Sequence, residues 1–478
     1  MVARRAKGKT APIPRIAALR IAKRGPSCHS GFELVKHRHA ADVLQRLRRA
    51  VGLHRQGKIA DAEAIYRAVL SRNPVQPDAL HFLGLLEQQH GRREEAIRLI
   101  RRATEVAPHY ADAFNNLGNV LKVNGDLEQA ETCYRKALAL RPHDANALSN
   151  LGAVLRAKGD LDAGEAACRS AIESDPSHIE AYNNLGNILS KQQRHDEAIA
   201  CYRASIALDP YHPDGPKLLG IALCAAGKPE EAKVVYRKWL DREPKNPVAA
   251  HLLAACSGEQ VPARASDEYV KNLFDGLAGE FDRHLSHLAY RAPELVMSAV
   301  ARELPDACGS LEVLDAGCGT GLCARWLRPY ARTLSGVDLS AGMLTYATHL
   351  ALYDKLMEEE LTAHLQARCA AYDLIICADT LCYFGSLDIV FAGARGALRA
   401  RGWFVFTVEQ ATDDLTPVGY RLSPHGRYCH AHDYVLDTLT KTGFRIATAE
   451  TATLRNEGGV PVAGLVVTAQ ACDQTASD

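Results

Sequence analysis

The sequence of 478 residues predicts two folds in one chain, an all-helical solenoid followed by an α/β domain with a mostly parallel sheet. Three observations carry this prediction. Prolines recur every 34 residues from Pro74 to Pro244, a glycine-rich turn follows the apolar run 311–315, and apolar runs then alternate with helical stretches. We expect the solenoid to occupy residues 41–256 and the α/β domain residues 257–478.

Composition excludes several classes of protein. The formal net charge is +1, from 57 basic and 56 acidic side chains, which argues against a globally basic nucleic-acid binder. No apolar run reaches the ~18 residues of a membrane-spanning helix. The 14 cysteines show neither CxxC pairs nor zinc-site spacing. We therefore expect reduced thiols, a cytoplasmic location and no metal site.

Residues 1–40 form a basic leader, with ten Lys and Arg residues against one acid, Glu33. This composition favours a disordered tail, and an organelle transit peptide is the alternative. The leader contains no apolar stretch long enough for a secretory signal, so we expect no export.

The 34-residue period is built from a few recurring positions. A Leu-Gly pair recurs from Gly84 to Gly220, a small residue recurs from Ala62 to Ala232, and a proline closes each unit. Each unit predicts two short amphipathic helices, because the small residue lets the helices approach and the proline ends the second one. A unit cannot bury its apolar face alone, so six units must stack, with a last helix over 246–255 covering the open end.

This pattern resembles the tetratricopeptide repeat, which implies a concave groove lined by the first helix of each unit. Asn116, Asn150 and Asn184 share one register position there. Such an asparagine ladder resembles that of the O-linked N-acetylglucosamine transferase family, and a side-chain amide can both donate to and accept from a peptide backbone. We predict a protein or peptide partner bound by these three residues; a polar solvent-facing surface is the alternative. The second half of the chain does not resemble that family's catalytic domain, which excludes a glycosyltransferase.

The second half alternates strands and helices, which implies a parallel sheet covered on both faces. The predicted strands, in chain order, are 311–315, 333–337, a weakly marked 355–359, 372–379, 403–409, 444–451 and 462–468.

The turn after the first strand carries Gly317, Gly319 and Gly321 in the sequence LDAGCGTG, and Asp338 closes the second strand. The GxGxG spacing, with Asp315 two residues earlier, departs from the dinucleotide-binding GxGxxG. It resembles the first motif of the class I S-adenosylmethionine-dependent methyltransferases. The resemblance covers residues 267–478 and implies a Rossmann-like, mostly parallel seven-stranded sheet that binds S-adenosyl-L-methionine at the carboxyl ends of its strands.

The resemblance also implies roles for single residues. The glycines let the backbone approach the ligand, Asp315 orients its amino end, Asp338 accepts hydrogen bonds from both ribose hydroxyls, and Glu360 takes the acidic position near the adenine. The predicted cofactor-binding residues are Asp315, Gly317, Cys318, Gly319, Gly321, Asp338, Leu339, Glu360 and Asp379.

Methyl transfer depends mainly on alignment of donor and acceptor and on exclusion of water. A base helps only where the acceptor must lose a proton. The candidate catalytic residues, Tyr383, His425 and His430, follow the fourth and fifth predicted strands. Arg427, in the same segment, is a candidate to pair with a substrate carboxylate. The alternative is an exposed polar loop.

The sequence thus predicts an S-adenosylmethionine-dependent methyltransferase whose repeat array recruits a protein that is the substrate or carries a small acceptor. No added nucleic-acid module is recognisable. The absence of an Asn-Pro-Pro-Tyr type sequence after the fourth strand argues against an adenine or glutamine amide acceptor. The alternative hypothesis is a non-catalytic scaffold that binds peptides through the groove and carries an inert methyltransferase fold.

Overall fold

The computed structural model describes residues 31–279, 281–411, 418–457 and 460–473. The chain forms two compact units, Met1–Asp209 and Pro210–Asp478. The predicted leader lies outside the described residues up to residue 30, and a helix begins at Gly31, within its predicted range. None of the described helices has the length and apolar character needed to cross a bilayer.

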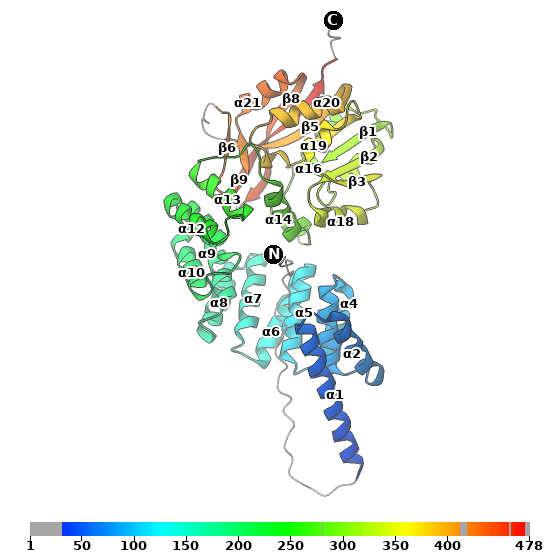
Figure 1. The fold of residues 1–478 in the computed structure, drawn as a ribbon, viewed down its shortest axis with the longest axis vertical. Helices are drawn as coiled ribbons and strands as arrows, with labels where there is room; N and C mark the ends of the chain where they lie inside the picture. Colours follow the sequence, from blue (N-terminus) through cyan, green and yellow to red (C-terminus); the bar gives the residue numbers. More distant parts are fainter. Residues whose placement is uncertain (1–30, 280, 412–417, 458–459, 474–478) are drawn as a thin grey trace, which may run out of the picture. The chain divides into compact units, whose positions relative to one another are not determined.

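The described part of the first unit contains only helices, which confirms the predicted solenoid (Figure 1). The helices pack as consecutive antiparallel pairs. Their bounds are α1 (Gly31–Arg55), α2 (Ile59–Arg72), α3 (Pro77–Gln89), α4 (Arg93–Val106), α5 (Ala111–Asn124), α6 (Leu127–Leu140), α7 (Ala145–Lys158), α8 (Leu161–Ser174), α9 (Ile179–Lys191) and α10 (His195–Leu208).

The recurring glycines mark the contact between the two helices of a repeat. A Cβ on Gly118 would lie 2.6 Å from the Tyr134 ring, and one on Gly186 would lie 2.5 Å from the Tyr202 ring. Both tyrosine rings are buried. The Leu-Gly position therefore exists because a bulky side chain of the second helix packs directly against it.

The turn between the two helices of a repeat requires a positive φ. Gly125 and Gly159 adopt φ values of 93° and 89° at the ends of α5 and α7. In the fifth repeat the corresponding residue is Gln193, which adopts a φ of 61°. The turn geometry is therefore kept where the glycine is missing, at the energetic cost of a left-handed non-glycine residue.

The second unit begins with three helices and continues into the α/β domain. The helices are α11 (Gly215–Ala225), α12 (Pro229–Arg242) and α13 (Pro247–Ser257), then α14 (Asp267–Leu277), α15 (Phe281–His287) and α16 (Ala292–Glu303), followed by α17 (Ala324–Leu327), α18 (Ala341–His349), α19 (Leu361–Gln366), η1 (Leu381–Tyr383), α20 (Asp388–Ala397) and α21 (His432–Lys441). The strands are β1 (Leu311–Ala316), β2 (Ala331–Asp338), β3 (Lys355–Glu358), β4 (Tyr372–Cys377), β5 (Leu398–Gln410), β6 (Tyr420–Leu422), β7 (Tyr428–His430), β8 (Phe444–Glu457) and β9 (Val460–Ala471).

The boundary between the compact units differs from the predicted domain boundary at residue 256. The last repeat and the helix α13 belong to the same unit as the sheet. The reason is a direct contact, because Ala254 and Ala255 of α13 form a buried cluster with Leu422 and Tyr428 of the β6–β7 hairpin. Helix α13 itself matches the closing helix predicted over 246–255.

The sheet has the strand order β3-β2-β1-β4-β5, all parallel, with β9 antiparallel to β5 and β8 antiparallel to β9. These seven strands are those predicted, including the weakly marked third one. Two further short strands give nine: β7 pairs with the end of β5, and β6 pairs with β7. The segment 420–430 is thus part of the sheet. The alternative considered for this segment, an exposed polar loop, is wrong for its two strands.

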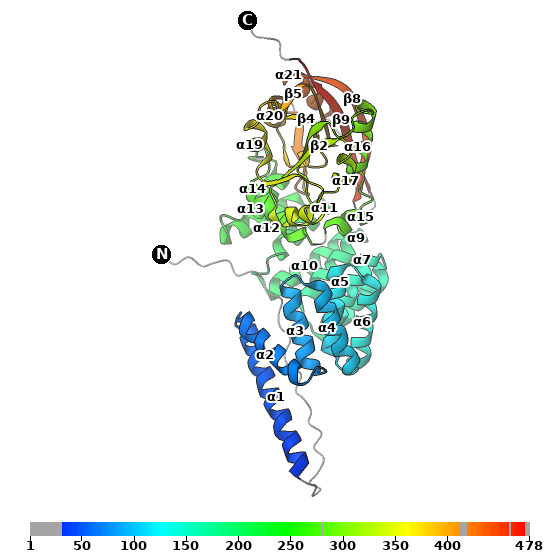
Figure 2. The ribbon, with the colours of Figure 1, turned by 90° about the vertical axis from the view of Figure 1, so that its right-hand side faces the viewer.

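Helices cover both faces of the sheet (Figure 2). Buried side chains of α19, α20 and α21 pack in one cluster with Phe404 and Phe406 of β5. Buried side chains of α16 and α17 pack in another with Val313 of β1 and Val405 of β5. Because the chain continues from β1 to β2 on one side and returns to β4 on the other, the order reverses beside β1, where α/β sheets bind ligands.

Candidate functional site

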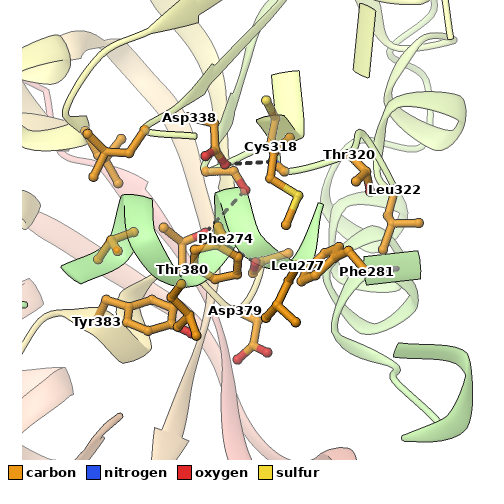
Figure 3. A pocket seen from close by; sticks show the side chains of 18 of the residues that line it. Phe274, Leu277, Phe281, Cys318, Thr320, Leu322, Asp338, Asp379, Thr380 and Tyr383 are labelled. Atoms are coloured by element: carbon orange, nitrogen blue, oxygen red, sulfur yellow. Dashed lines mark hydrogen bonds between the residues drawn. The ribbon is translucent and has the colours of Figure 1, made fainter. Parts of the chain in front are cut away.

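A cavity of about 330 Å³ lies at the carboxyl ends of β1, β2 and β4 (Figure 3). The turns that follow these strands line one side of it. Phe274 and Leu277 of α14 and Phe281 of α15 line another side. The cavity therefore sits at the reversal of strand order and has an apolar wall of helical side chains.

Two aspartates hold these helices against the turns. Asp275 of α14 accepts a hydrogen bond from the Ser340 hydroxyl at 2.5 Å, and Asp282 of α15 accepts one from the Thr320 hydroxyl at 2.5 Å. Neither was predicted as a site residue, because each acts on a partner about 40 to 65 positions away in sequence. Their contacts fix the apolar wall over the glycine-rich turn.

The glycine-rich turn places its backbone in conformations that side chains disfavour. Gly317 and Gly319 adopt φ values of 77° and 55°. A Cβ on Gly317 would lie 2.1 Å from the Thr380 hydroxyl oxygen, so this glycine is required by the fold itself. A Cβ on Gly319 would have no neighbour closer than 3.9 Å, and Gly319 lines the cavity. The space beside Gly319 is therefore part of the cavity and is not filled by protein atoms.

Asp338 lies at the end of β2 and connects the neighbouring turns. Its Oδ2 accepts a hydrogen bond from the Gly319 amide at 2.8 Å, and its Oδ1 accepts one from the Ser340 amide at 2.8 Å. Burial raises the pKa of this carboxyl group, while the backbone amides of Ser340, Gly319 and Leu339 oppose the shift. Each oxygen keeps a further lone pair for a ligand hydroxyl.

Asp315 lies beneath the same turn and is buried. Its Oδ2 accepts a hydrogen bond from the Tyr353 hydroxyl at 2.7 Å. Burial raises the pKa of Asp315 to about 7, partly opposed by that hydrogen bond. Asp315, Cys318 and Leu339 line the cavity, whereas Gly321 does not, because a Cβ there would meet Leu350 at 2.7 Å on the far side of the turn.

Glu360 also lines the cavity, one residue after Glu359, at the end of β3. Its carboxylate accepts hydrogen bonds from the Thr362 and Ala363 amides at 3.0 and 2.8 Å. Glu360 is thus the N-cap of α19. These two hydrogen bonds fix the orientation of the Glu360 carboxylate. The position of Glu360 near an adenine stays a prediction.

Opposite Asp338 in Figure 3, the cavity ends at Asp379, which adopts a φ of 55°. Arg455 Nη1 donates to both Asp379 oxygens, at 3.0 and 2.8 Å, and its Nε donates to Glu457 at 2.7 Å. Arg427 Nε donates to Glu409 at 2.5 Å, and its Nη2 donates to Glu457 at 2.5 and 2.6 Å. Arg455 Nη2 also donates to Glu409. We call these five residues, Asp379, Glu409, Arg427, Arg455 and Glu457, the ion cluster.

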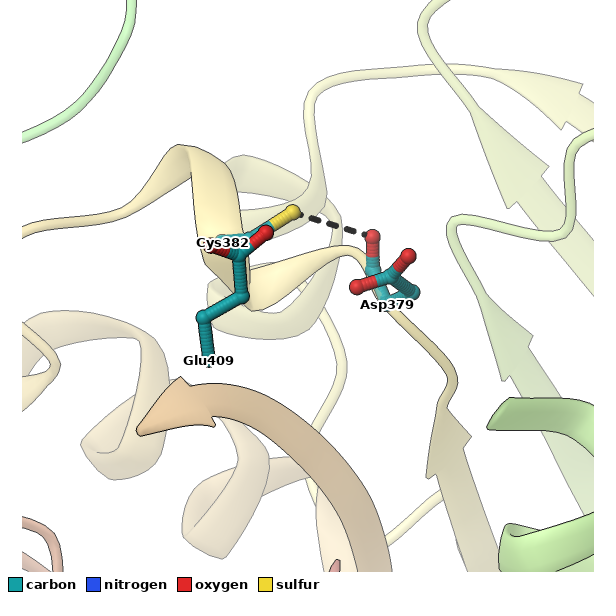
Figure 4. A group of neighbouring side chains, drawn as sticks. All are labelled: Asp379, Cys382 and Glu409. Carbon is teal, nitrogen blue, oxygen red and sulfur yellow. Dashed lines mark hydrogen bonds between the residues drawn. The ribbon is translucent and has the colours of Figure 1, made fainter. Parts of the chain in front are cut away.

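Asp379, Cys382 and Glu409 place three possible metal ligands within 4.8 Å of one another (Figure 4). Both carboxylates are already bound to Arg455. Burial raises the pKa of the Cys382 thiol well above its ordinary value, and its Sγ donates to the Asp379 carbonyl at 3.2 Å. The Arg455 guanidinium thus supplies the positive charge that a metal ion would bring.

The structure brings one of the three candidate catalytic residues to the cavity. Tyr383 lines it, edge-to-face with Phe274 at 5.4 Å between ring centroids. His430 has no exposed surface, its Nε2 bonds the Gly385 carbonyl at 3.1 Å, and burial lowers its pKa to about 4. His425 is 43% exposed and does not line the cavity. The β6–β7 hairpin is the reason, because it turns His430 into the protein interior.

The asparagine ladder of the first unit makes contacts between repeats. Asn116, 8% exposed, donates from Nδ2 to His81 Nε2 at 2.9 Å. Asn150 donates to Asn115 Oδ1 at 3.1 Å, and Asn184 donates to the Ser149 hydroxyl at 3.0 Å. Each amide therefore binds the preceding repeat, and a role in holding a peptide stays a prediction.

Comparisons with known proteins agree with this division of the chain. A methyltransferase domain family matches residues 314–406. Tetratricopeptide repeat families match residues 53–118, 115–179 and 179–212. The repeat portion is similar to two solved structures. One is Pseudomonas aeruginosa PilF, at 16% identity and TM-score 0.40, covering 44% of this chain and 96% of that one. The other is PilW, a type IV pilus biogenesis factor, at 18% identity and TM-score 0.42, covering 44% and 98%. Scores this low carry no argument about function.

The curated relatives are named as methyltransferases or as methyltransferase-like. Methyltransferase-like protein 27 of Homo sapiens is 41% identical over 86 residues, 18% of this chain and 35% of that protein. Malonyl-[acyl-carrier protein] O-methyltransferase of Pectobacterium atrosepticum is 35% identical over 92 residues, which are 19% of this chain and 34% of that protein. The enzyme of that name from Geobacter sulfurreducens is 28% identical over 190 residues, which are 37% of this chain and 70% of that protein. The chain thus spans about a third of the first two relatives. Together with the sheet order and the glycine-rich turn, the family matches show that the protein joins a tetratricopeptide repeat solenoid to a methyltransferase domain.

Proposed function

We propose that the protein is an S-adenosylmethionine-dependent methyltransferase whose repeat solenoid recruits the protein that is, or carries, the methyl acceptor. The observation that carries this proposal is the cradle formed by Gly319 and Asp338. The glycine leaves room for a ligand, and the carboxylate beside it keeps lone pairs for ribose hydroxyls. Such a cradle fits a nucleoside ligand that carries no phosphate, because carboxylates rather than cations surround it.

The acidic lining supports a cationic ligand. Asp315, Asp338, Glu359 and Glu360 all line this end of the cavity, and Arg264 is the cation among the lining residues near them. S-adenosylmethionine carries a net positive charge through its sulfonium, and it supplies a methyl carbon already activated for transfer. Opposite charges in a partly desolvated site attract more strongly than in water.

The remaining task of the protein is to align the acceptor and exclude water. Phe274, Leu277 and Phe281 form an apolar wall between the cradle and the ion cluster. Asp275 and Asp282 hold that wall in place through Ser340 and Thr320. The chain therefore offers an apolar wall along the cavity from the donor end to the end where the acceptor would lie.

The recruiting role of the repeats is supported by the kind of acceptor named for two relatives. Both are malonyl-[acyl-carrier protein] O-methyltransferases, whose acceptor is attached to a protein. A tetratricopeptide solenoid is a surface suited to binding a protein chain. We propose that the array presents a protein-borne acceptor to the methyltransferase domain.

Calorimetric titration of the full-length protein with S-adenosylmethionine tests the proposed donor. We expect saturable binding, and Asp338→Asn should weaken it roughly 10- to 100-fold, because hydrogen bonds to a charged group contribute about 1.5–3 kcal/mol each. Asp306→Asn, an exposed aspartate outside the cavity, is the matched control. Binding by the Asp338 variant equal to that of the control would overturn the proposal.

Transfer of labelled methyl groups from S-adenosylmethionine to proteins of a cell extract tests the recruiting role. The double variant Asn150→Ala, Asn184→Ala should lower transfer to protein while leaving donor affinity unchanged. Asn124→Ala, exposed at the end of α5, is the control. Transfer that is insensitive to the double variant would contradict recruitment through the ladder.

A further inference from the structure

The ion cluster at the far end of the cavity has an unequal number of charges. Among the described residues, two guanidiniums face three carboxylates there. Although burial opposes it, Arg427 and Arg455 hold the pKa of Glu457 down to about 2. Burial raises the pKa of Asp379 against the pull of Arg455. Asp379 lines the cavity and Glu409 does not, so Asp379 is the buried carboxylate of the cluster that an acceptor in the cavity can reach.

The two arginines are already occupied by internal partners. Arg455 uses Nε, Nη1 and Nη2 on cluster carboxylates, and Arg427 uses Nε and Nη2. An incoming carboxylate would have to displace one of these partners and would add negative charge to a cluster that already has an excess. In a buried site that arrangement is unfavourable. The cluster is therefore a poor receptor for an anion, although it contains two arginines.

Aromatic rings form the passage to the cluster. Phe274 lies edge-to-face with Phe281 at 5.8 Å and with Tyr383 at 5.4 Å between ring centroids (Figure 3). Tyr290 also lines the cavity, and burial together with the charge of Asp379 raises the pKa of its hydroxyl well above the ordinary value. The faces of such rings attract cations. An excess carboxylate behind a set of aromatic rings is an arrangement that selects a cation.

We propose that the methyl acceptor is a primary amine, which enters as an ammonium past Phe274 and Tyr383 and gives its proton to Asp379. This inference rests on the proposed function, and it assigns Asp379 to the acceptor rather than to the cofactor. A carboxylate acceptor, as named for two relatives, needs no base and would meet the excess negative charge.

The ammonium nitrogen loses one proton to an Asp379 oxygen and regains its lone pair. That lone pair forms the new nitrogen–carbon bond to the donor methyl group, while the sulfur–carbon bond breaks and its electron pair stays on sulfur. The products are a protonated N-methylamine, a neutral thioether and a protonated Asp379, which returns its proton to solvent.

Two probes of equal length test the charge preference. The full-length protein is saturated with S-adenosylhomocysteine, and ligand-observed NMR measures the affinities of n-pentylammonium and of pentanoate. We expect n-pentylammonium to bind at least about 10-fold more tightly. Asp379→Asn should remove most of that preference, and Asp306→Asn should leave it unchanged. Equal affinities, no binding of either probe, or a preference for pentanoate would overturn the assignment.

A second variant guards against misfolding, because Asp379→Asn changes a buried partner of Arg455. Glu457→Gln removes one negative charge from a less buried position of the same cluster and should reduce the preference several-fold. Glu450→Gln, on the same strand but paired with Arg302 away from the cavity, is its matched control. A preference equal in the Glu457 and Glu450 variants would contradict the proposal. Failure to bind S-adenosylhomocysteine would instead overturn the proposed function, so the two failures are distinguishable.

Discussion

The Asp338 carboxylate accepts a hydrogen bond from the Gly319 backbone amide at 2.8 Å. The end of β2 therefore holds the turn that follows β1 in its open shape. A Cβ at position 319 would leave this bond in place, because it would meet no protein atom closer than 3.9 Å. The two glycines of the turn are therefore needed for different reasons. Gly317 is required by the fold, because a Cβ there would overlap Thr380, whereas Gly319 leaves space for a ligand.

Gly319→Ala should therefore affect the ligand more than the fold. We expect a loss of about 1 kcal/mol in unfolding free energy, the cost of a left-handed alanine, and at least about a 10-fold loss of affinity for S-adenosylmethionine. Calorimetric titration and thermal unfolding of the same sample measure the two effects.

Gly309→Ala is the matched control for that substitution. Gly309 also has a positive φ, 59°, with no atom within 4 Å of its Cβ position, and it does not line the cavity. It should lose similar stability and keep its donor affinity. Gly317→Ala should instead lose about 1–3 kcal/mol of stability, because its Cβ would overlap Thr380. Equal donor affinities in the position 309 and 319 variants would show that no ligand occupies the cradle.

Asn116→Ala tests how much of the asparagine ladder is structural. The substitution leaves the buried His81 Nε2 without its donor, which should cost about 1–3 kcal/mol in the stability of the repeat unit. Amide hydrogen exchange in α3 and α5 reports that loss in the full-length protein. Asn184→Ala removes an amide whose partner, Ser149, is a hydroxyl that can reorient, so it should cost less. Equal effects would mean that the ladder has no special member at Asn116.

The same contact predicts a pH dependence. His81 is fully buried, donates from Nδ1 to the Tyr110 hydroxyl oxygen at 2.9 Å and accepts from Asn116 at Nε2. Burial lowers its pKa to about 3, whereas an unfolded histidine titrates near 6.5. Between these values the unfolded chain binds a proton that the native chain does not. Stability should therefore fall as the pH drops below about 6.5, by about 1.4 kcal/mol per pH unit for this one residue.

Hydrogen exchange of α3 and α5 between pH 6.5 and 4.5 measures that slope, after correction for the intrinsic exchange rate. His81→Gln should reduce the slope of stability against pH by the amount that corresponds to one bound proton, even if it lowers stability at every pH. The control variant is His143→Gln, which replaces an exposed histidine outside these contacts. An unchanged slope in the His81 variant would show that this histidine is not held neutral.

Local patterns explain what the sequence could predict. The repeats are set by contacts within about 34 residues, such as Gly118 against Tyr134, so their period is visible along the chain. The cradle is likewise a local turn between β1 and a helix, with Asp338 at the end of the next strand. Positive φ values at Gly317 and Gly319 show that these glycines have a backbone reason.

Contacts between distant segments explain what it could not predict. Arg455 reaches Asp379 across 76 positions, through the pairing of β8 with β9 and of β9 with β5. No motif surrounds Arg455, so its place at the cavity follows only from the sheet. The β6–β7 hairpin has strands of three residues each, too short for a visible alternation, and its burial of His430 was therefore missed.

The contact between α13 and the hairpin predicts where the second unit can be cut. His251 Nε2 donates to the Gly426 carbonyl at 2.8 Å, and its ring stacks on Tyr269 at 3.9 Å between centroids. A fragment of residues 257–478 lacks this helix, while a fragment of residues 210–478 keeps it. The shorter fragment should lose about 2–3 kcal/mol, which corresponds to a melting temperature lower by roughly 4–10 °C.

A point variant separates this contact from the effect of truncation. In the 210–478 fragment, His251→Ala should lower the stability by about half or more of the difference between the two fragments, because it removes the hydrogen bond and the stacked ring. It keeps the contact of Ala254 and Ala255 with Leu422 and Tyr428. His349→Ala, exposed at the end of α18, should leave the melting temperature unchanged. Equal melting temperatures of the two fragments would show that α13 only closes the repeats. A difference would show that this helix is a structural part of the methyltransferase domain, since Arg427 of the ion cluster directly follows the carbonyl that His251 holds.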